Sequence, residues 1–215
     1  MNIDLKILQM ICSRLCHDLV GLSSGINAGL ELLADDQDIG GESFNLSKTS
    51  AEQIAHRLAF FRVAFGLAEG RNGALTNFEA KNLCSHFINK QKTAIKWFDL
   101  LGDKYDQSVS QINLKVLLNL VFIAERCLPR GGEILAYYSK TAGGSGLAIE
   151  AIGESAFLSE KNLAALSKDC CAEDLDPTNV PIYLSRCIIE DKGGTLNVEL
   201  KNGNDKIQFI SFFPE

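Results

Sequence analysis

The chain has 215 residues, of which 46% are hydrophobic and 22% are charged, and its formal net charge at pH 7 is −6. This length suffices for one large domain or two small ones, and the negative charge argues against nonspecific binding to nucleic acid. The sequence has neither an apolar run long enough to cross a bilayer nor the features of a signal peptide, so we expect a cytoplasmic protein without membrane contact.

Residues 1–70 are predicted to be helical, because they contain no proline and no strand-like alternation. Apolar residues at three- and four-residue steps predict an amphipathic helix over about 2–34. The acidic stretch 35–41 predicts a turn, and Ser43 is the expected N-cap of a second helix that ends near Gly66 or Gly70. The expected buried stripes consist of Leu8, Cys12, Leu15, Leu19, Leu22, Ile26, Leu30 and Leu33, and of Ala51, Ile54, Leu58, Phe61 and Phe65.

Two helices joined by a short turn form an αα-hairpin, and a single hairpin cannot bury both of its apolar stripes. Two hairpins related by a two-fold axis would bury the stripes in a four-helix bundle, so we expect a homodimer. The alternative is that the hairpin packs against a second domain of its own chain.

From about residue 75 onward, helices and strands alternate, which predicts an α/β layer with one face of the sheet covered. The expected fold class is α+β, with a helical hairpin domain over 1–72 and an α/β domain over 73–215. Helices are expected over 77–90, 110–127, 159–168 and 179–191, and strands over 94–98, 133–139, 146–152, 195–200 and 206–213, the last two joined by a turn at Asn202-Gly203-Asn204.

The seven cysteines are an odd number and form no CxxC motif, which favours reduced thiols over a disulfide framework. Cys12, Cys16 and His17 are close enough in sequence to suggest a metal site. However, Cys12 and Cys16 share one helical face, while His17 lies about 100° away from it. Buried structural cysteines are therefore the preferred interpretation, since a free thiol packs as a small apolar group.

His17 is the main candidate for a reactive residue. It lies between Leu15 and Leu19 of the apolar stripe, and at about 100° per residue it points roughly away from that stripe toward solvent. A neutral imidazole on an open helix face is a good phosphoryl acceptor, because the ring nitrogen remote from the backbone attacks in line and needs little beyond positioning. The alternative is an ordinary surface histidine.

Residues near His17 favour phosphoryl chemistry. Asp18 is the candidate orienting carboxylate, which would hold the proton on the other ring nitrogen and raise the nucleophilicity of the ring. Small residues that follow leave room for another protein, and Arg14, one turn earlier, is placed to meet phosphate oxygens. The expected partner-binding residues are Arg14, Leu15, Val20, Gly21 and Ser24, whereas His56 and His86 are interpreted as structural.

Three blocks of the sequence, in order, are similar to one known family. Residues 13–19 read Ser-Arg-Leu-Cys-His-Asp-Leu, and residues 60–66 read Phe-Phe-Arg-Val-Ala-Phe-Gly. The third block is Leu-Leu-Asn-Leu at 117–120, followed by Leu-Pro-Arg-Gly-Gly at 128–132. These blocks resemble the ChpT family of histidine phosphotransferases, and the similarity covers nearly the whole chain.

The resemblance implies a dimeric four-helix bundle like that of histidine kinases, followed by a degenerate form of the kinase ATP-binding domain. It implies that His17 receives a phosphoryl group from an aspartate on the receiver domain of a hybrid histidine kinase and passes it to an aspartate on a response regulator. Such a chain acts as a phosphotransferase in a two-component phosphorelay, and any Mg²⁺ would belong to the partner receiver domain.

The second domain is not expected to bind ATP, because three parts of the kinase nucleotide site are altered. Ile123 stands in place of a magnesium-binding Asn, and its alkyl side chain cannot coordinate Mg²⁺. Ala151 stands in place of the Asp that hydrogen-bonds adenine. The glycine positions of the phosphate loop hold Pro177, Asn179 and Pro181, and the prolines lack N–H donors. We therefore expect no cofactor.

Two other classes of function stay open at this point. One is a scaffold that binds receiver domains without transferring phosphate, and the other is an ATP-dependent histidine kinase. The second domain is expected to position a receiver domain over His17, or else only to stabilise the dimer.

Overall fold

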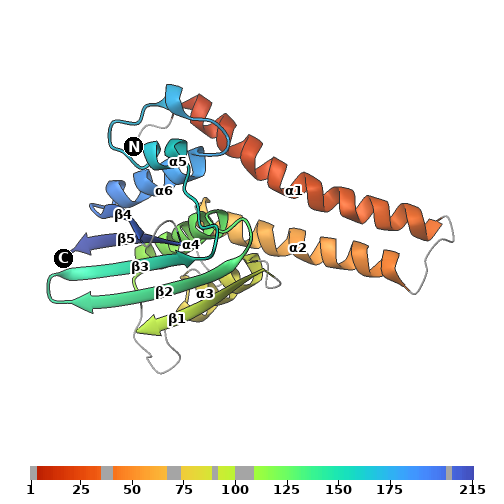
Figure 1. Ribbon diagram of the computed structural model, residues 1–215, viewed down its shortest axis with the longest axis horizontal. Helices are drawn as coiled ribbons and strands as arrows, with labels where there is room; N and C mark the ends of the chain where they lie inside the picture. Colours follow the sequence, from red (N-terminus) through yellow and green to blue (C-terminus); the bar gives the residue numbers. More distant parts are fainter. Residues whose placement is uncertain (1–3, 35–40, 67–73, 89–91, 100–108, 202–204) are drawn as a thin grey trace.

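The computed structural model describes residues 4–34, 41–66, 74–88, 92–99, 109–201 and 205–215. Two long helices, α1 (Leu5–Ala34) and α2 (Glu42–Ala64), form a hairpin that projects from a body of helices and strands (Figure 1). The body contains α3 (Asn77–Phe87), β1 (Thr93–Asp99), α4 (Gln111–Arg126), β2 (Gly132–Thr141), β3 (Gly144–Ile152), α5 (Glu160–Ala164), η1 (Ala172–Asp174), α6 (Val180–Asp191), β4 (Thr195–Lys201) and β5 (Lys206–Pro214). The fold class is α+β, as predicted.

The sheet has five strands in the order β1-β2-β3-β5-β4. β1 pairs parallel to β2, and the other neighbours are antiparallel. The parallel pair requires a long crossover, which α4 supplies. α4 packs against β2 and β3, and α6 packs against β4, so the core lies between these helices and the sheet.

Helix starts in the body follow the capping residues of the sequence. The Thr76 hydroxyl accepts a hydrogen bond from the backbone N–H of Glu79, and together these two residues form a capping box before α3. The Ser110 hydroxyl caps α4 by accepting from the backbone N–H of Asn113. Such caps satisfy N–H groups that have no partner within the helix, which fixes where it begins.

The hairpin differs from the sequence prediction at the start of α2. The predicted cap, Ser43, lies inside the helix and is buried, and the N-cap position is Gly41 with φ 76°. Glycine adopts this left-handed conformation without steric cost, so it can turn the chain into α2. All but Gly41 of the predicted turn at 35–41 lies outside the described residues, as do the predicted helix end at Gly70, the 72/73 domain boundary and the 202–204 turn.

Close packing of α1 against α2 explains why Ser43 is buried. A Cβ atom built on Gly29 would lie 2.6 Å from the Ser43 carbonyl oxygen and 2.2 Å from the Ser47 hydroxyl oxygen. The Ser47 hydroxyl in turn donates a hydrogen bond to the Ile26 carbonyl oxygen, 3.1 Å away. Glycine on one helix and serine on the other therefore let the two backbones approach closely.

A Gly29→Ala substitution should lower the free energy of unfolding by about 1–3 kcal/mol, because its methyl group would overlap a backbone oxygen that cannot rotate away. Urea denaturation followed by circular dichroism measures this change. Gly21→Ala is the matched control, since a Cβ atom there meets nothing within 4 Å. Equal stability of the two variants would contradict the close approach of α1 and α2.

The base of the hairpin is fixed to the body by aromatic packing. Phe60 of α2 stacks on Phe87 of α3 with ring centroids 4.1 Å apart, and Phe61 meets the edge of Phe122 of α4 at 6.1 Å. These rings are buried. The hairpin thus packs onto the second domain at its base, which is the alternative that the sequence left open, and its distal part projects away (Figure 1).

A buried polar contact reinforces this junction. The Asn119 side-chain amide donates to the carbonyl oxygen of Ala64, the last residue of α2, at 2.9 Å. The Ser185 hydroxyl of α6 donates to Oδ1, the oxygen of the same Asn119 amide, at 3.0 Å. Asn119 is 1% exposed, so these bonds satisfy groups that water does not reach. Asn119 therefore links α2, α4 and α6.

Two further features of the helices differ from the prediction. Within the single chain the most buried residues of α1 are Ile7, Met10 and Ile11, whereas in the predicted stripe Leu15 and Leu19 pack against the core and Leu8 and Leu30 are more than half exposed. The helix predicted over 159–168 is shorter, and the η1 turn was not predicted. Within the described residues, every helix is too short or too polar to span a membrane.

Candidate functional site

His17 lies in the middle of α1, near the base of the hairpin. Its side chain is 79% exposed, as its position in the helix indicates. Because most of its surface is exposed among the described residues, a second protein can reach the ring. The sequence produces this exposure because the inward positions of α1 fall on neighbouring residues, including Arg14 and Asp18.

The Asp18 carboxylate is 7% exposed and is held by two guanidinium groups. Its Oδ1 atom lies 2.8 Å from Arg14 Nη2, one turn earlier in α1. Its Oδ2 atom accepts a 2.5 Å hydrogen bond from Arg126 Nη2 at the end of α4. The Oδ1 atom also lies 3.6 Å from His17 Nδ1, which is slightly longer than a hydrogen bond. A buried, fixed negative charge therefore stands beside an exposed imidazole.

Arg126 was missed by sequence reasoning. It lies 108 residues from Asp18, and no spacing rule connects the two. Its guanidinium carbon lies 4.4 Å from the centroid of the Phe122 ring, one turn earlier in α4. Burial lowers the pKa of the Arg126 guanidinium, and the nearby Asp18 carboxylate opposes this shift.

The five predicted partner-binding residues divide into two groups. Val20, Gly21 and Ser24 are exposed on α1 after His17, and the Ser24 hydroxyl donates to the Val20 carbonyl oxygen at 3.1 Å. Arg14 is only 14% exposed and faces Asp18, while Leu15 is half-buried and packs against the core. The first group adjoins His17 on the surface, and the second faces the interior.

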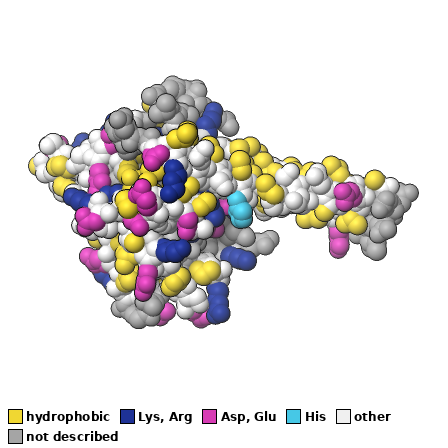
Figure 2. All heavy atoms as spheres, turned by 90° about the horizontal axis from the view of Figure 1, so that it is seen from above, with side chains coloured by type: hydrophobic (Ala, Val, Ile, Leu, Met, Phe, Trp, Pro, Cys, Tyr) yellow, Lys and Arg dark blue, Asp and Glu magenta, His cyan; other side chains and the backbone are white. Residues whose placement is uncertain are grey.

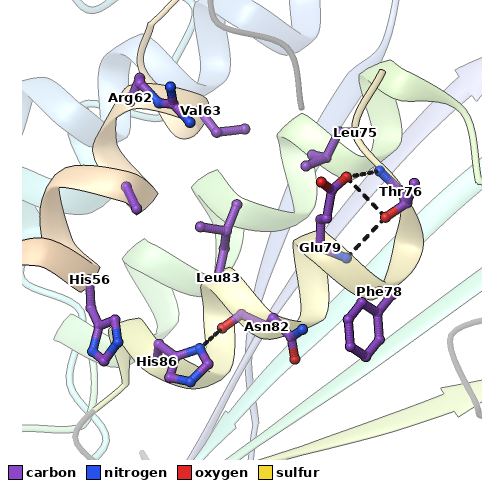
Figure 3. A pocket seen from close by; sticks show the side chains of 11 residues that line it. His56, Arg62, Val63, Leu75, Thr76, Phe78, Glu79, Asn82, Leu83 and His86 are labelled. Atoms are coloured by element: carbon purple, nitrogen blue, oxygen red, sulfur yellow. Dashed lines mark hydrogen bonds between the residues drawn. The ribbon is translucent and has the colours of Figure 1, made fainter. Parts of the chain in front are cut away.

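The other two histidines lie together, between α2 and α3. The His56 and His86 rings have centroids 4.5 Å apart, and His86 Nδ1 lies 2.7 Å from the Asn82 carbonyl oxygen. Both rings line a cavity of about 610 Å³, whose wall also includes Arg62 and Phe78 (Figure 3). Unlike His17, which lies beside the Asp18 carboxylate, these two imidazoles face one another.

The cysteine prediction was wrong for α1. Cys12 and Cys16 are exposed, because the buried face of the helix lies on Ile7, Met10 and Ile11. Across the described part of the chain, no group of three or more His, Cys, Asp or Glu side chains is arranged to hold a metal ion.

The residues that the sequence predicts to stand in an altered nucleotide site are apolar or are hydrogen-bonded within the chain. Ile123 and Ala151 are fully buried in the core. Asn179 is 1% exposed, and its side-chain oxygen accepts a 2.8 Å hydrogen bond from the backbone N–H of Asp176. Pro181 lies in the first turn of α6, where it removes an N–H donor.

Comparison with known proteins extends these observations. Residues 78–204, more than half of the chain, match the family described as histidine phosphotransferase C-terminal domain. The chain is 26% identical over 189 residues to the protein phosphotransferase ChpT of Brucella abortus (strain 2308), covering 88% of each. A solved structure of a bacterial phosphotransferase is similar over 98% of both chains, with 25% identity and a TM-score of 0.79.

Proposed function

Because this chain belongs to the family of ChpT-like histidine phosphotransferases, we propose that it relays a phosphoryl group on His17 between the aspartates of receiver domains. The donor is the receiver domain of a hybrid histidine kinase, and the acceptors are response regulators. The observation that carries the proposal is the exposed His17 ring beside a buried, paired Asp18 carboxylate. The other two histidines lack that arrangement.

The transfer needs few groups from this chain. With the proton on Nδ1, the lone pair of His17 Nε2 attacks the phosphorus of an aspartyl phosphate, and the bond from phosphorus to the donor carboxylate oxygen breaks. The ring then carries the phosphoryl group and a positive charge. A second receiver aspartate reverses these steps. Mg²⁺ would be supplied by the receiver domains, and Val20, Gly21 and Ser24 are proposed to contact them.

The active form is proposed to be a homodimer. Several large apolar side chains of α1 and α2 are exposed in the single chain, namely Leu8, Leu30, Leu32, Phe44, Leu46 and Leu58. Hydrophobic side chains are spread along the hairpin, whereas most of the visible charged side chains lie on the body (Figure 2). A second hairpin would cover this apolar surface in a four-helix bundle.

The proposal is tested by incubating the purified chain with each phosphorylated receiver domain of the source organism. Label should pass from a small number of receivers to this chain, and from this chain to others. Phosphohistidine is recognised because it is lost in acid and stable in alkali. Binding to receivers without any transfer would instead support a scaffold.

Incubation with γ-labelled ATP and Mg²⁺ alone should leave the chain unlabelled, because Ile123 cannot coordinate the metal and Ala151 cannot accept a hydrogen bond from adenine. The measurement is autoradiography after denaturing electrophoresis, with the same chain labelled by a receiver as the positive control. Label on His17 from ATP alone would show kinase activity and contradict the proposed loss of the nucleotide site.

A further inference from the structure

The bond between Arg126 and Asp18 joins the second domain to the residue next to His17. Asp18 belongs to the hairpin and Arg126 to the end of α4, and their side chains meet at 2.5 Å with the carboxylate almost entirely buried. A carboxylate buried to this degree is costly unless it is paired on both oxygens. Arg14 occupies one oxygen and Arg126 the other, so the second domain supplies half of the pairing.

Arg126 is itself held in place. Its guanidinium lies over the Phe122 ring, and Phe122 is fully buried in the aromatic packing at the base of the hairpin. An arginine that is stacked and partly buried loses little freedom when it forms a hydrogen bond. The position of Arg126 is therefore set by the core of the second domain. Its hydrogen bond in turn fixes the position of the Asp18 carboxylate.

We propose that Arg126 is a positioning residue for phosphoryl transfer, through which the second domain acts on His17. This inference rests on the proposed function. Arg126 and Arg14 together hold Asp18 Oδ1 beside His17 Nδ1, at 3.6 Å, where a small movement makes a hydrogen bond. The second domain thus contributes to the reacting site itself, in addition to any contact with a receiver domain.

The chemical effect follows from the charge that develops on the ring. When Nε2 forms its bond to phosphorus, the ring becomes cationic while Nδ1 keeps its proton. A carboxylate fixed beside Nδ1 favours the tautomer that leaves Nε2 free, and it stabilises the cation. Without Arg126, Asp18 would be free to turn toward solvent or toward Arg14 alone.

The first test uses potassium phosphoramidate, which phosphorylates histidine without a partner protein by losing ammonia from phosphorus. Arg126→Gln should slow labelling of His17 about tenfold, and Arg126→Lys should recover part of the rate. Lys201→Gln, which removes a cation from the exposed strand β4, should react like the wild type. A wild-type rate for Arg126→Gln would overturn the inference.

A double-mutant cycle and NMR separate positioning from a general loss of structure. The Asp18→Asn/Arg126→Gln double variant should react no more slowly than Asp18→Asn, because Arg126 acts through Asp18. The ¹⁵N chemical shifts of His17 report the fraction of the ring in the Nδ1–H tautomer. This fraction should be lower than in the wild type in Arg126→Gln, and also in the folded Arg126→Lys variant. Additive losses, or unchanged tautomers in both variants, would show that Arg126 has only a structural role.

The same proteins distinguish this inference from the proposed function. If no phosphorylated receiver labels the wild-type chain, the proposed phosphorelay fails. If receivers label the wild type and Arg126→Gln at equal rates, only the role of Arg126 fails.

Discussion

A His17→Ala variant is expected to lose phosphoryl transfer from every receiver domain, with labelling falling below detection, because His17 is exposed beside a paired carboxylate whereas His56 and His86 face one another. Its free energy of unfolding should change by less than about 0.5 kcal/mol, since the side chain is 79% exposed and packs against little. The measurements are transfer from a labelled receiver and urea denaturation.

His86→Ala is the matched control, because His86 is also an exposed helical histidine but faces His56. It should accept label at close to the wild-type rate. Both variants should still bind receiver domains, which calorimetry can verify. Transfer to the His17→Ala chain, or its loss in His86→Ala alone, would place the phosphoacceptor elsewhere.

Asn119→Ala is expected to have the largest effect on stability, lowering the free energy of unfolding by about 2–4 kcal/mol. The substitution removes a donor to the Ala64 carbonyl oxygen and the acceptor of the Ser185 hydroxyl hydrogen bond at a site that is 1% exposed. Unfolding in urea, followed by circular dichroism, measures the change. Because Asn119 contacts the last residue of α2, the hairpin should also lose protection from hydrogen exchange near its base.

Asn197→Ala, on an exposed position of β4, provides the comparison and should change stability by less than about 0.5 kcal/mol. If Asn119→Ala and Asn197→Ala were equally stable, the contact between Asn119 and the end of α2 would contribute nothing to the junction.

Much of the body could be predicted from the sequence, because its signals are local. Most of β2 and β5 alternates in burial, Ser110 caps α4, and the apolar run of α4 is almost completely buried. The hairpin was harder. Small residues such as Gly29 and Ser47 form its tightest contact, and they carry no hydrophobic signal, so periodicity assigned the buried face of α1 to Leu8 and its neighbours instead.

The candidate site, too, could be predicted from the sequence only in part. The exposure of His17 follows from helix geometry, and the adjacent Asp18 is visible in the sequence. Arg126 could not be found by spacing, because its contact with Asp18 depends on how α4 packs against the base of the hairpin. Arg14 pairs with the same carboxylate from within α1, four residues earlier.

The aromatic packing of Phe60 and Phe61 against Phe87 and Phe122 has a consequence for protein engineering. Signalling helices are often treated as interchangeable cassettes that can be cut at a linker and fused to a new domain. In this chain such a cut would expose two phenylalanines and separate Asp18 from one of its cations. A functional chimera would have to carry the matching surface of α3 and α4 along with the hairpin.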